Sequence, residues 1–459
     1  MIDLFTEKRA MAARAKTLRV SGRVLEVAGL TVVADGLPLP VGSLCRIEAV
    51  GGGAMAAQIV GAQGDRAILL PLHDPRGIAV GDRVTSRSGL QHVPVGRQML
   101  GTVLNGLGRP IGGRTDFAVE AHYPVYRDAP PALSRGPIDR VLSTGIRVID
   151  AMHTLGGGQR LGIFAGTGVG KSVLLGMIAR CTAADVTVVA LIGERGREVG
   201  DFIRKDLGED GLQRCVMVVS TSDESPVLRV RAGFVATAVA EYFRDLGKDV
   251  LLLMDSTTRM AMAQRQIGLS AGEPPTTKGY PPSVFSLLPQ LLERSGRTAS
   301  GSITGLYTVL VEGDDLTEPI ADAIRGVLDG HVWLSRDLAN RGHYPAVSVN
   351  ESISRVMTDV VDEDHRKAAV TLRRVLASWS DVEDLVNVGA YAVGANVEFD
   401  VAVRMKPAID AFVQQAISER AGFTDTRRRL VELAAQINAL RDQIASRAGG
   451  AKNGAQSGR

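Results

Sequence analysis

The chain has 459 residues, of which 45% are hydrophobic and 22% are charged. These proportions are ordinary for a soluble globular protein of two or three domains. The net charge of +3 is too small to indicate nucleic-acid binding, and the aromatic content of 4% argues against stacking platforms for single strands. No apolar run is long enough to cross a membrane, so we expect a cytoplasmic protein with at most peripheral membrane contact. Cys45, Cys181 and Cys215 stand alone in apolar surroundings and are expected to be buried thiols.

The N-terminal part of the chain is predicted to be a small β-barrel. Across residues 18–95, short segments rich in Val, Ile and Leu alternate with glycine, which is typical of short strands joined by turns. The preceding residues 1–17 have a basic bias, and they could form an amphipathic helix or a disordered or docked tail. A Gly/Pro-rich turn region, Leu100 to Gly113, leads into a proline-studded connection from Pro124 to Pro137, which we interpret as a linker.

The rest of the chain changes from an α/β pattern to a helical one. Continuous apolar runs separated by helix-length segments indicate a parallel sheet, so residues 96–360 are predicted to form an α/β nucleotide domain. Helical patterns dominate residues 361–446, a predicted C-terminal helical domain, and residues 447–459 are expected to be a disordered tail. A heptad-like seam in the last helix consists of Leu430, Leu433, Ile437, Leu440 and Ile444. Such a seam is more often the core of a bundle than a surface for a partner.

The segment from Arg160 to Ser172, RLGIFAGTGVGKS, has the pattern of a phosphate-binding P-loop. An apolar strand enters a glycine-rich turn and a helix begins near Lys171, so backbone N–H groups and the positive helix end can surround phosphates. Lys171 would reach the β- and γ-phosphates, and the Ser172 hydroxyl would ligate Mg²⁺. The usual first glycine is replaced by Ala165, where a small residue suffices. The predicted nucleotide-binding residues of the loop are Gly166, Thr167, Gly168, Val169, Gly170, Lys171, Ser172 and Val173.

Two acidic residues that follow apolar strands complete a candidate hydrolytic site. The run DVLLLMD ends at Asp255, which can hold Mg²⁺ as a Walker-B aspartate does. The run VTVVALIG is followed by Glu194. Because the carboxyl ends of strands in an open α/β sheet face the ligand crevice, Glu194 is placed to polarise water. For the neighbouring Arg197 and Glu198, ordinary solvated surface charge is an equally good interpretation.

Several longer motifs resemble one protein family. The segments AGTGVGKS, LIGERGREV, VLVEGDDLTEPIADAIRGVLDGHVWLSR and HYPAVSVNESISRVM, together with the stretch from DSTTRMAMAQ to PPSVFSLLPQ, are similar to the rotary-type ATPases, the α and β subunits of ATP synthases and their relatives. Within that family the chain is most similar to the export ATPases of bacterial type III secretion, especially the flagellum-specific ones. The resemblance implies an N-terminal β-barrel, a RecA-like P-loop domain with a parallel sheet, and a C-terminal α-helical domain.

The resemblance also implies roles for individual residues. Glu194 matches the catalytic glutamate of the family, and Arg195 matches an arginine near the γ-phosphate. Tyr344 matches an aromatic residue that packs on the adenine, and Arg355 matches an arginine finger that reaches the nucleotide of the neighbouring subunit. The expected ligands are therefore ATP and Mg²⁺, and the expected assembly is a homohexamer with its sites at subunit interfaces.

One part of the finger segment departs from the family pattern. The departures are at Ser348, Asn350 and Glu351. They reflect either drift in a tolerant loop or a modified contact between subunits.

The resemblance further implies partners and a location. In similar proteins the N-terminus binds a stator-like regulatory dimer and can touch acidic lipid. The C-terminal domain faces the export gate, chaperone–substrate complexes and a central coiled-coil stalk protein, for which residues 430–444 are the expected place. The implied location is the cytoplasmic side of the inner membrane at the flagellar base.

Four alternatives remain open from the sequence. The nearest is an ATPase of non-flagellar type III secretion, which shares these motifs. A catalytic β subunit of an ATP synthase and a purely nucleotide-binding adaptor are further possibilities. A Rho-type RNA translocase would need an RNA-binding barrel, whereas residues 18–95 contain no Phe, Tyr or Trp.

Overall fold

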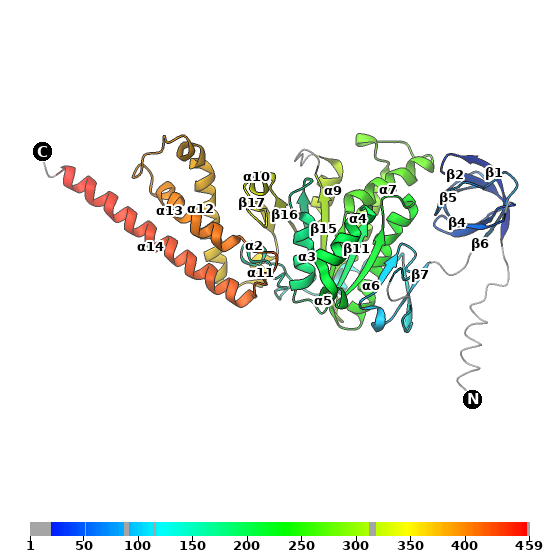
Figure 1. Cartoon of the computed structure of the whole chain (residues 1–459), viewed down its shortest axis with the longest axis horizontal. Helices are drawn as coiled ribbons and strands as arrows, with labels where there is room; N and C mark the ends of the chain where they lie inside the picture. Colours follow the sequence, from blue (N-terminus) through cyan, green and yellow to red (C-terminus); the bar gives the residue numbers. More distant parts are fainter. Residues whose placement is uncertain (1–19, 51, 87–90, 113–115, 312–317, 457–459) are drawn as a thin grey trace, which may run out of the picture.

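The structure is a computed structural model that describes residues 20–50, 52–86, 91–112, 116–311 and 318–456. Figure 1 shows three parts in a row: a β-barrel near the N-terminus, a sheet flanked by helices in the middle, and long helices toward the C-terminus. This arrangement confirms the predicted fold class. The predicted N-terminal segment 1–17 and the EGDD motif at 312–315 lie outside the described residues.

Six strands close into the N-terminal barrel in the order β1-β2-β5-β4-β3-β6. Because β1 pairs with both β2 and β6, the ring of hydrogen bonds is complete and the described barrel has no free edge. Val32, Ile47 and Leu69 point inward and are fully buried, and the Cys45 thiol joins them in the core. The strands are β1 Ser21–Ala28, β2 Thr31–Asp35, β3 Leu44–Glu48, β4 Ala54–Gln63, β5 Arg66–Pro71 and β6 Arg83–Ser86.

The middle part is built on a sheet with the order β17-β16-β10-β15-β13-β11-β12-β8, and β14 pairs with β15 at one side. All neighbours along this path are parallel except β16 and β17, which are antiparallel. The strands are β8 Val103–Asn105, β10 Arg160–Ala165, β11 Val186–Ile192, β12 Cys215–Ser220, β13 Asp249–Asp255, β14 Gly296–Arg297, β15 Ser302–Leu310, β16 Gly330–Leu334 and β17 Val347–Ser354. The central strands are buried on both faces, as their continuous apolar runs predict.

Helices cover both faces of this sheet. One buried cluster joins α2 and α3 to the sheet and to the C-terminal helices, and a second joins α6, α7, α8 and α9 to the opposite face. The helices are α2 Arg147–Met152, α3 Lys171–Cys181, α4 Gly196–Asp201, α5 Gly208–Gln213, α6 Pro226–Asp245, α7 Thr257–Ser270, α8 Pro282–Leu292, α9 Pro319–Val327, α10 Arg336–Asn340 and α11 Met357–Val360, with a π-helical segment η3 at Phe202–Leu207. The helices on the two faces hold the sheet in place, and the site residues follow the ends of its strands.

The segment that precedes the predicted linker is part of the folded domain. Strand β8, within the turn region from Leu100 to Gly113, extends the central sheet by pairing with β12. Strands β7 (His92–Val95) and β9 (Ala121–Pro124) pair with each other, so residues 92–95 lie outside the barrel in which we had placed them. Val125 is fully buried against the helices. Beyond Val125, the predicted linker from Pro124 to Pro137 is irregular and mostly exposed, apart from the short 3-10 turn Ala132–Ser134.

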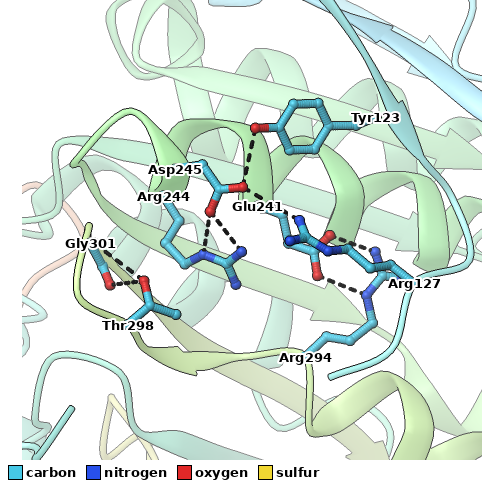
Figure 2. Close-up of polar contacts among 8 residues, drawn as sticks. All are labelled: Tyr123, Arg127, Glu241, Arg244, Asp245, Arg294, Thr298 and Gly301. Atoms are coloured by element: carbon cyan, nitrogen blue, oxygen red, sulfur yellow. Dashed lines mark hydrogen bonds and ion pairs between the residues drawn. The ribbon is translucent and has the colours of Figure 1, made fainter. Parts of the chain in front are cut away.

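A buried ion pair holds this segment on the helices. Figure 2 shows Arg294, just after α8, making two hydrogen bonds of 2.9 and 2.8 Å to the carboxylate of Glu241 on α6. A third nitrogen of the same guanidinium donates to the Val125 carbonyl at 2.6 Å. Nearby, the Tyr123 hydroxyl and Arg127 both contact Asp245 at the end of α6 (Figure 2). These contacts join three segments that are distant in the sequence.

The C-terminal part consists of α12 (Glu363–Asn387), α13 (Val397–Val413) and α14 (Phe423–Gln456). Leu430, Leu433 and Ile437 of the predicted seam are buried in the core that these helices share with the sheet, so this part of the seam is bundle core. Helix α14 continues to Gln456, whereas we expected disorder from residue 447 (Figure 1). The difference has a physical reason, because extending an existing helix costs much less than starting one. Among the described residues, no helix is both long and apolar enough to span a bilayer.

Candidate active site

The P-loop leaves the end of β10 and leads into α3, as predicted. Gly168 and Gly170 have φ angles of 82° and 88°, a left-handed conformation that side chains rarely adopt. A Cβ on Gly170 would also lie 3.3 Å from the Tyr344 ring. Ala165 is the last residue of β10 and is fully buried between β15 and β16. A small apolar residue therefore suits that position, and the loop itself starts one residue later.

Lys171 and Asp255 meet at the carboxyl ends of β10 and β13. The Lys171 ammonium forms an ion pair with Oδ1 of Asp255, and both side chains are largely buried. The Thr308 hydroxyl donates to the same carboxylate oxygen at 2.7 Å and fixes its orientation. The structure thus brings the predicted phosphate-binding lysine and the predicted Walker-B aspartate into direct contact.

Glu194 lies beside this pair. Its Oε1 is 3.8 Å from the Lys171 ammonium, and Gly193 before it has a φ of 72°, which turns the chain at the end of β11. Burial, and next the negative charge of Asp255, raise the pKa of Glu194 to about 7, against the lowering effect of Lys171. A carboxylate with a pKa near neutrality is suited to exchange a proton with water.

Arg259 is a site residue that the sequence analysis missed. Its Nε donates to Oε1 of Glu194 at 3.1 Å. Arg259 lies in the first turn of α7, which begins directly after the Asp255 strand and is capped by Ser256. A signal was present, because a residue in the first turn of a helix that follows a catalytic strand faces the same crevice.

Arg195, which the resemblance places near the γ-phosphate, does not face the site in this chain. Its side chain is 78% exposed and lies 3.6 Å from Glu198 on the same helix end. Between the two arginines, Arg259 and not Arg195 contacts the candidate catalytic carboxylate. The role of Arg195 stays a prediction.

An apolar pocket of about 370 Å³ adjoins the P-loop. Tyr344 lines it, half exposed, with its hydroxyl 3.3 Å from the Ala339 carbonyl. An exposed ring beside a phosphate site can stack on a planar base, so this is where a nucleoside would lie. The lining residues are Gly168, Val169, Gly170, Val173, Leu174, Met177, Leu334, Tyr344, Pro345, Ala346, Gln415, Ala416 and Ile417. The last three come from the C-terminal part and were not predicted.

Arg355 lies far from the P-loop of its own chain. Because β17 is antiparallel to β16, its last residue Ser354 pairs with Gly330 at the start of β16, while Val347 pairs with Leu334 at the P-loop end. At about 3.3 Å per residue, the strand separates Arg355 from the P-loop edge by roughly 13 Å. The exposed Arg355 side chain has no hydrogen bond or ion pair within the described part of the chain.

The departures from the family pattern lie on the same strand as the finger. Asn350 and Glu351 are exposed on β17, and the Glu351 carbonyl contacts His331 at 2.9 Å. The Ser348 carbonyl accepts a hydrogen bond from Ser352. These residues are in an edge strand and not in a loop, and Asn350 and Glu351 lie where the pairing of β17 with β16 is irregular.

The residues present fit a Mg²⁺ ion that is shared with phosphates. In the described residues, no group of three or more His, Cys, Asp or Glu could hold a metal by itself. Mg²⁺ at phosphate-transfer sites usually takes one or two protein oxygens and completes its shell with water and phosphate. The described contacts of Asp255 use Oδ1, so Oδ2 and the exposed Ser172 hydroxyl are suitable hard ligands.

Comparisons with known proteins agree with this geometry. A family model described as "ATP synthase alpha/beta family, nucleotide-binding domain" matches residues 145–354, and one described as "T3SS EscN ATPase C-terminal domain" matches residues 361–432. A flagellum-specific ATP synthase from Treponema pallidum is 49% identical over 92% of this chain and 95% of its own. A type 3 secretion system ATPase from Xanthomonas euvesicatoria is 48% identical, over 88% and 92%. The assembled ATPase EscN from enteropathogenic E. coli has a TM-score of 0.85 at 40% identity, covering 90% of this chain and all of that one.

Fold and site together define a P-loop ATPase with a RecA-like domain. The chain belongs to the ATP synthase α/β family, in the group that includes flagellum-specific ATP synthases and type III secretion ATPases. The resemblance noted in the sequence is thereby confirmed, as are the fold class and the assignment as an ATP-hydrolysing enzyme.

Proposed function

We propose that this ATPase is the motor of a flagellar protein export apparatus, in which ATP hydrolysis drives release and unfolding of export substrates. Besides the Treponema relative, a flagellum-specific ATP synthase from Salmonella typhimurium is 48% identical over 94% of this chain and 96% of its own.

The observation that carries the enzymatic part is the contact of Lys171 with Asp255, with Glu194 3.8 Å from the lysine. The Xanthomonas relative supports the second candidate, export by a non-flagellar type III system.

The chain's own groups supply the proposed chemistry. The P-loop amides and Lys171 would hold the phosphates, while Ser172 and Asp255 would hold Mg²⁺, which would neutralise phosphate charge when it is bound with ATP. Ionised Glu194 accepts a proton from the water as the water oxygen bonds to the γ-phosphorus, the bond to the β-phosphate oxygen breaks, and ADP leaves. Arg259 keeps the carboxylate oriented through its 3.1 Å hydrogen bond. Tyr344 would stack on the adenine in the pocket beside the loop.

The placement of Arg355 supports a ring. The phosphate site lies at the carboxyl ends of the parallel strands, and Arg355 lies at the side of the sheet where those strands begin. A finger that cannot serve its own site can serve the next copy in a head-to-tail arrangement, and such an arrangement forms a ring when its rotation closes. A homohexamer of this kind places Arg195, Asn350 and Glu351 at or near each interface.

Further partners follow from the proposed role. A structure of EscN in complex with its central stalk EscO has a TM-score of 0.83 to this chain at 40% identity, which supports a stalk partner here. We place an export gate and chaperone–substrate complexes on the C-terminal side, and a stator-like dimer and the inner membrane on the N-terminal side. The buried Leu430 and Ile437 leave only the outer face of α14 for such a contact.

Deletion of the gene, followed by assays of swimming and of filament-protein export, tests the biological role. We expect loss of both, with recovery by the wild-type chain and not by Glu194→Gln. A deletion strain that swims normally would overturn the flagellar assignment. Loss of a secreted non-flagellar effector in that strain would favour the second candidate.

A further inference from the structure

The residue that precedes Arg355 is held by one turn of the chain, residues 154–159. The Ser354 hydroxyl donates to the Thr154 carbonyl at 3.0 Å and accepts from Nε2 of Gln159 at 3.0 Å. Gln159 is fully buried, and it lies directly before β10, the strand that leads into the P-loop. Both ends of the turn therefore contact the same hydroxyl.

The backbone of Arg355 itself is held by Asp329. The Arg355 N–H donates to the Asp329 carbonyl at 3.0 Å, and Nε2 of Gln159 donates to the same carbonyl at 3.3 Å. The carboxylate of Asp329 is bound by the backbone N–H of Arg160 at 3.0 Å and by the Arg160 guanidinium at 3.2 Å. The position of this carbonyl is thus set by Gln159 and Arg160, which are adjacent in the chain.

The residue after Arg355 packs against the same turn. Val356 is 8% exposed, and a Cβ on Gly156 would lie 2.8 Å from its side chain and 2.2 Å from that of Ile138. The turn therefore approaches as closely as a glycine allows. Residues 354–356 are all held in this way, whereas the Arg355 side chain between them is exposed.

We propose that Gln159 and Ser354 are positioning residues that hold the backbone of the finger, so that the Arg355 guanidinium enters the phosphate site of a neighbouring copy in one orientation. The amide of Gln159 is saturated, since its Oε1 accepts from the Gly156 N–H at 3.0 Å, so it acts only through Arg355. A preorganised charge stabilises the transition state without being ordered first, and a misplacement of about 1 Å can cost about 100-fold in rate. The inference rests on the proposed ring.

Two serines of β17 provide a matched pair of variants. Ser354→Ala removes the bound hydroxyl, whereas Ser348→Ala removes a hydroxyl for which no hydrogen bond is described. For Ser354→Ala we expect kcat to fall roughly tenfold, with KM for ATP within about twofold of wild type. Ser354→Thr, which keeps the hydroxyl, should recover most of that loss, and Ser348→Ala should match wild type. An unchanged kcat in Ser354→Ala would overturn the proposal.

A double variant shows whether Ser354 acts through the finger. Once Arg355 is replaced, its orientation no longer matters, so Ser354→Ala combined with Arg355→Ala should be as slow as Arg355→Ala alone. A further tenfold loss in the double variant would mean that Ser354 acts by another route.

Mixed rings give a readout that a merely structural role would not move. Lys171→Ala cannot turn over at its own phosphate site, but it offers its neighbour an intact finger. In an equal random mixture with Ser354→Ala, about a quarter of the interfaces join an intact P-loop to that finger. The mixture should therefore be more active per chain than Ser354→Ala alone, roughly two- to threefold for a tenfold defect. If Ser354→Ala instead damages its own site or fold, the mixture will be less active than Ser354→Ala alone, because half of the chains lack a working P-loop.

Gln159→Ala tests the buried part of the support. It should lower kcat at least as much as Ser354→Ala, and mixing with Lys171→Ala should raise the activity per chain in the same way. A loss that such mixing does not relieve would contradict the role of Gln159. If Gln159→Ala does not fold, the Ser354 variants decide.

Failure of the ring and failure of this inference can be told apart. If Arg355→Ala keeps wild-type turnover, or does not complement Lys171→Ala in rings shown to be mixed, the finger between subunits is wrong and the positioning role falls with it. If those two variants complement each other while Ser354→Ala keeps its kcat, the positioning role alone is wrong.

Discussion

Glu194 combines burial with close charged neighbours. It is mostly buried, and it lies between a carboxylate and two cations, Lys171 and Arg259. Its pKa of about 7 means that a proton is gained or lost within the physiological pH range. In the free enzyme, the charge of this base therefore depends on its burial and on the charges of Asp255, Lys171 and Arg259.

The acidic limb of the pH profile should report this residue. Because the base must be ionised, we expect kcat/KM for ATP to fall as the pH drops through about 7. Glu194→Gln should lose turnover while retaining ATP binding, which a nucleotide-binding titration checks. An acidic limb near pH 4.5, the ordinary value for a glutamate, would contradict the assignment.

The same variant should change stability in a pH-dependent way. A carboxyl whose pKa is raised in the folded state contributes stability below its unfolded pKa, and this stability is lost as the pH rises through the folded value. Wild type therefore carries an unfavourable charge at pH 8 that Glu194→Gln lacks. We expect the variant to be more stable at pH 8 by at most about 3 kcal/mol, and the advantage to vanish at pH 4, as thermal melts at both pH values would show.

Arg259 should control the pKa of Glu194. The positive charge of Arg259 lowers that pKa, so Arg259→Ala should move the acidic limb of kcat/KM to higher pH and reduce activity at pH 7. Arg197→Ala is the matched control, because Arg197 is 89% exposed and pairs with Asp201 instead. An unshifted limb in Arg259→Ala would mean that the hydrogen bond at 3.1 Å has no influence on the base.

At the scale of elements, the sequence predicted those site residues whose roles are set by their immediate neighbours in the chain. The P-loop was recognised because strand, glycine turn and Lys-Ser are contiguous in the sequence, and Asp255 and Glu194 because each directly follows an apolar strand. Arg259 was missed although its place in the first turn after the Asp255 strand is a local signal, whereas Gln415 was missed because its contacts join distant segments. Gln415 is 268 residues from Arg147, whose N–H it accepts, and no periodicity reveals such a pairing.

The segment from residue 92 to 127 shows the same limit. Residues 92–95 were predicted to belong to the barrel and Leu100 to Gly113 to be a turn region, yet the segment contributes β7, β8 and β9 and is bound by Arg294. A buried arginine in the sequence gives no sign of its partner. The length of α14 was underestimated for a related reason. The composition of residues 447–459 predicts disorder, but it does not account for the preceding helix, which can be extended at low cost.

The Glu241–Arg294 pair should be critical for stability. Both side chains are fully buried, and removing one partner leaves an uncompensated charge in the core. We expect Arg294→Met to lower the free energy of unfolding by about 3–5 kcal/mol, measured by denaturant titration. The double variant Glu241→Met with Arg294→Met should recover part of that loss, because neither charge remains.

An exposed contact in the same network serves as the control. Arg127 reaches Asp245 at 3.4 Å and is about half exposed, so Arg127→Ala should cost no more than about 1 kcal/mol. Equal losses for Arg127→Ala and Arg294→Met would show that burial does not set the energy of these contacts.

At the scale of the whole molecule, the two parts of the proposed active site lie at opposite ends of the sheet's strands. The P-loop follows the carboxyl end of β10, whereas Arg355 follows the end of the antiparallel β17, on the other side of the sheet. The proposed chemistry needs both the P-loop of one chain and Arg355 of its neighbour, so activity should depend on assembly. Dilution below the association range should therefore reduce the specific activity per chain.

Mixing two inactive variants tests this division directly. Lys171→Ala should not turn over because its phosphate site is broken, and Arg355→Ala because it offers no finger to its neighbour, a loss of about 10³ or more in rate. In an equal and random mixture, about a quarter of the interfaces pair an intact P-loop with an intact Arg355. The mixture should regain activity in that proportion after the rings are dissociated and reassembled together. If mixed rings form, as differently tagged chains that co-purify would show, and activity does not return, the finger does not act between subunits.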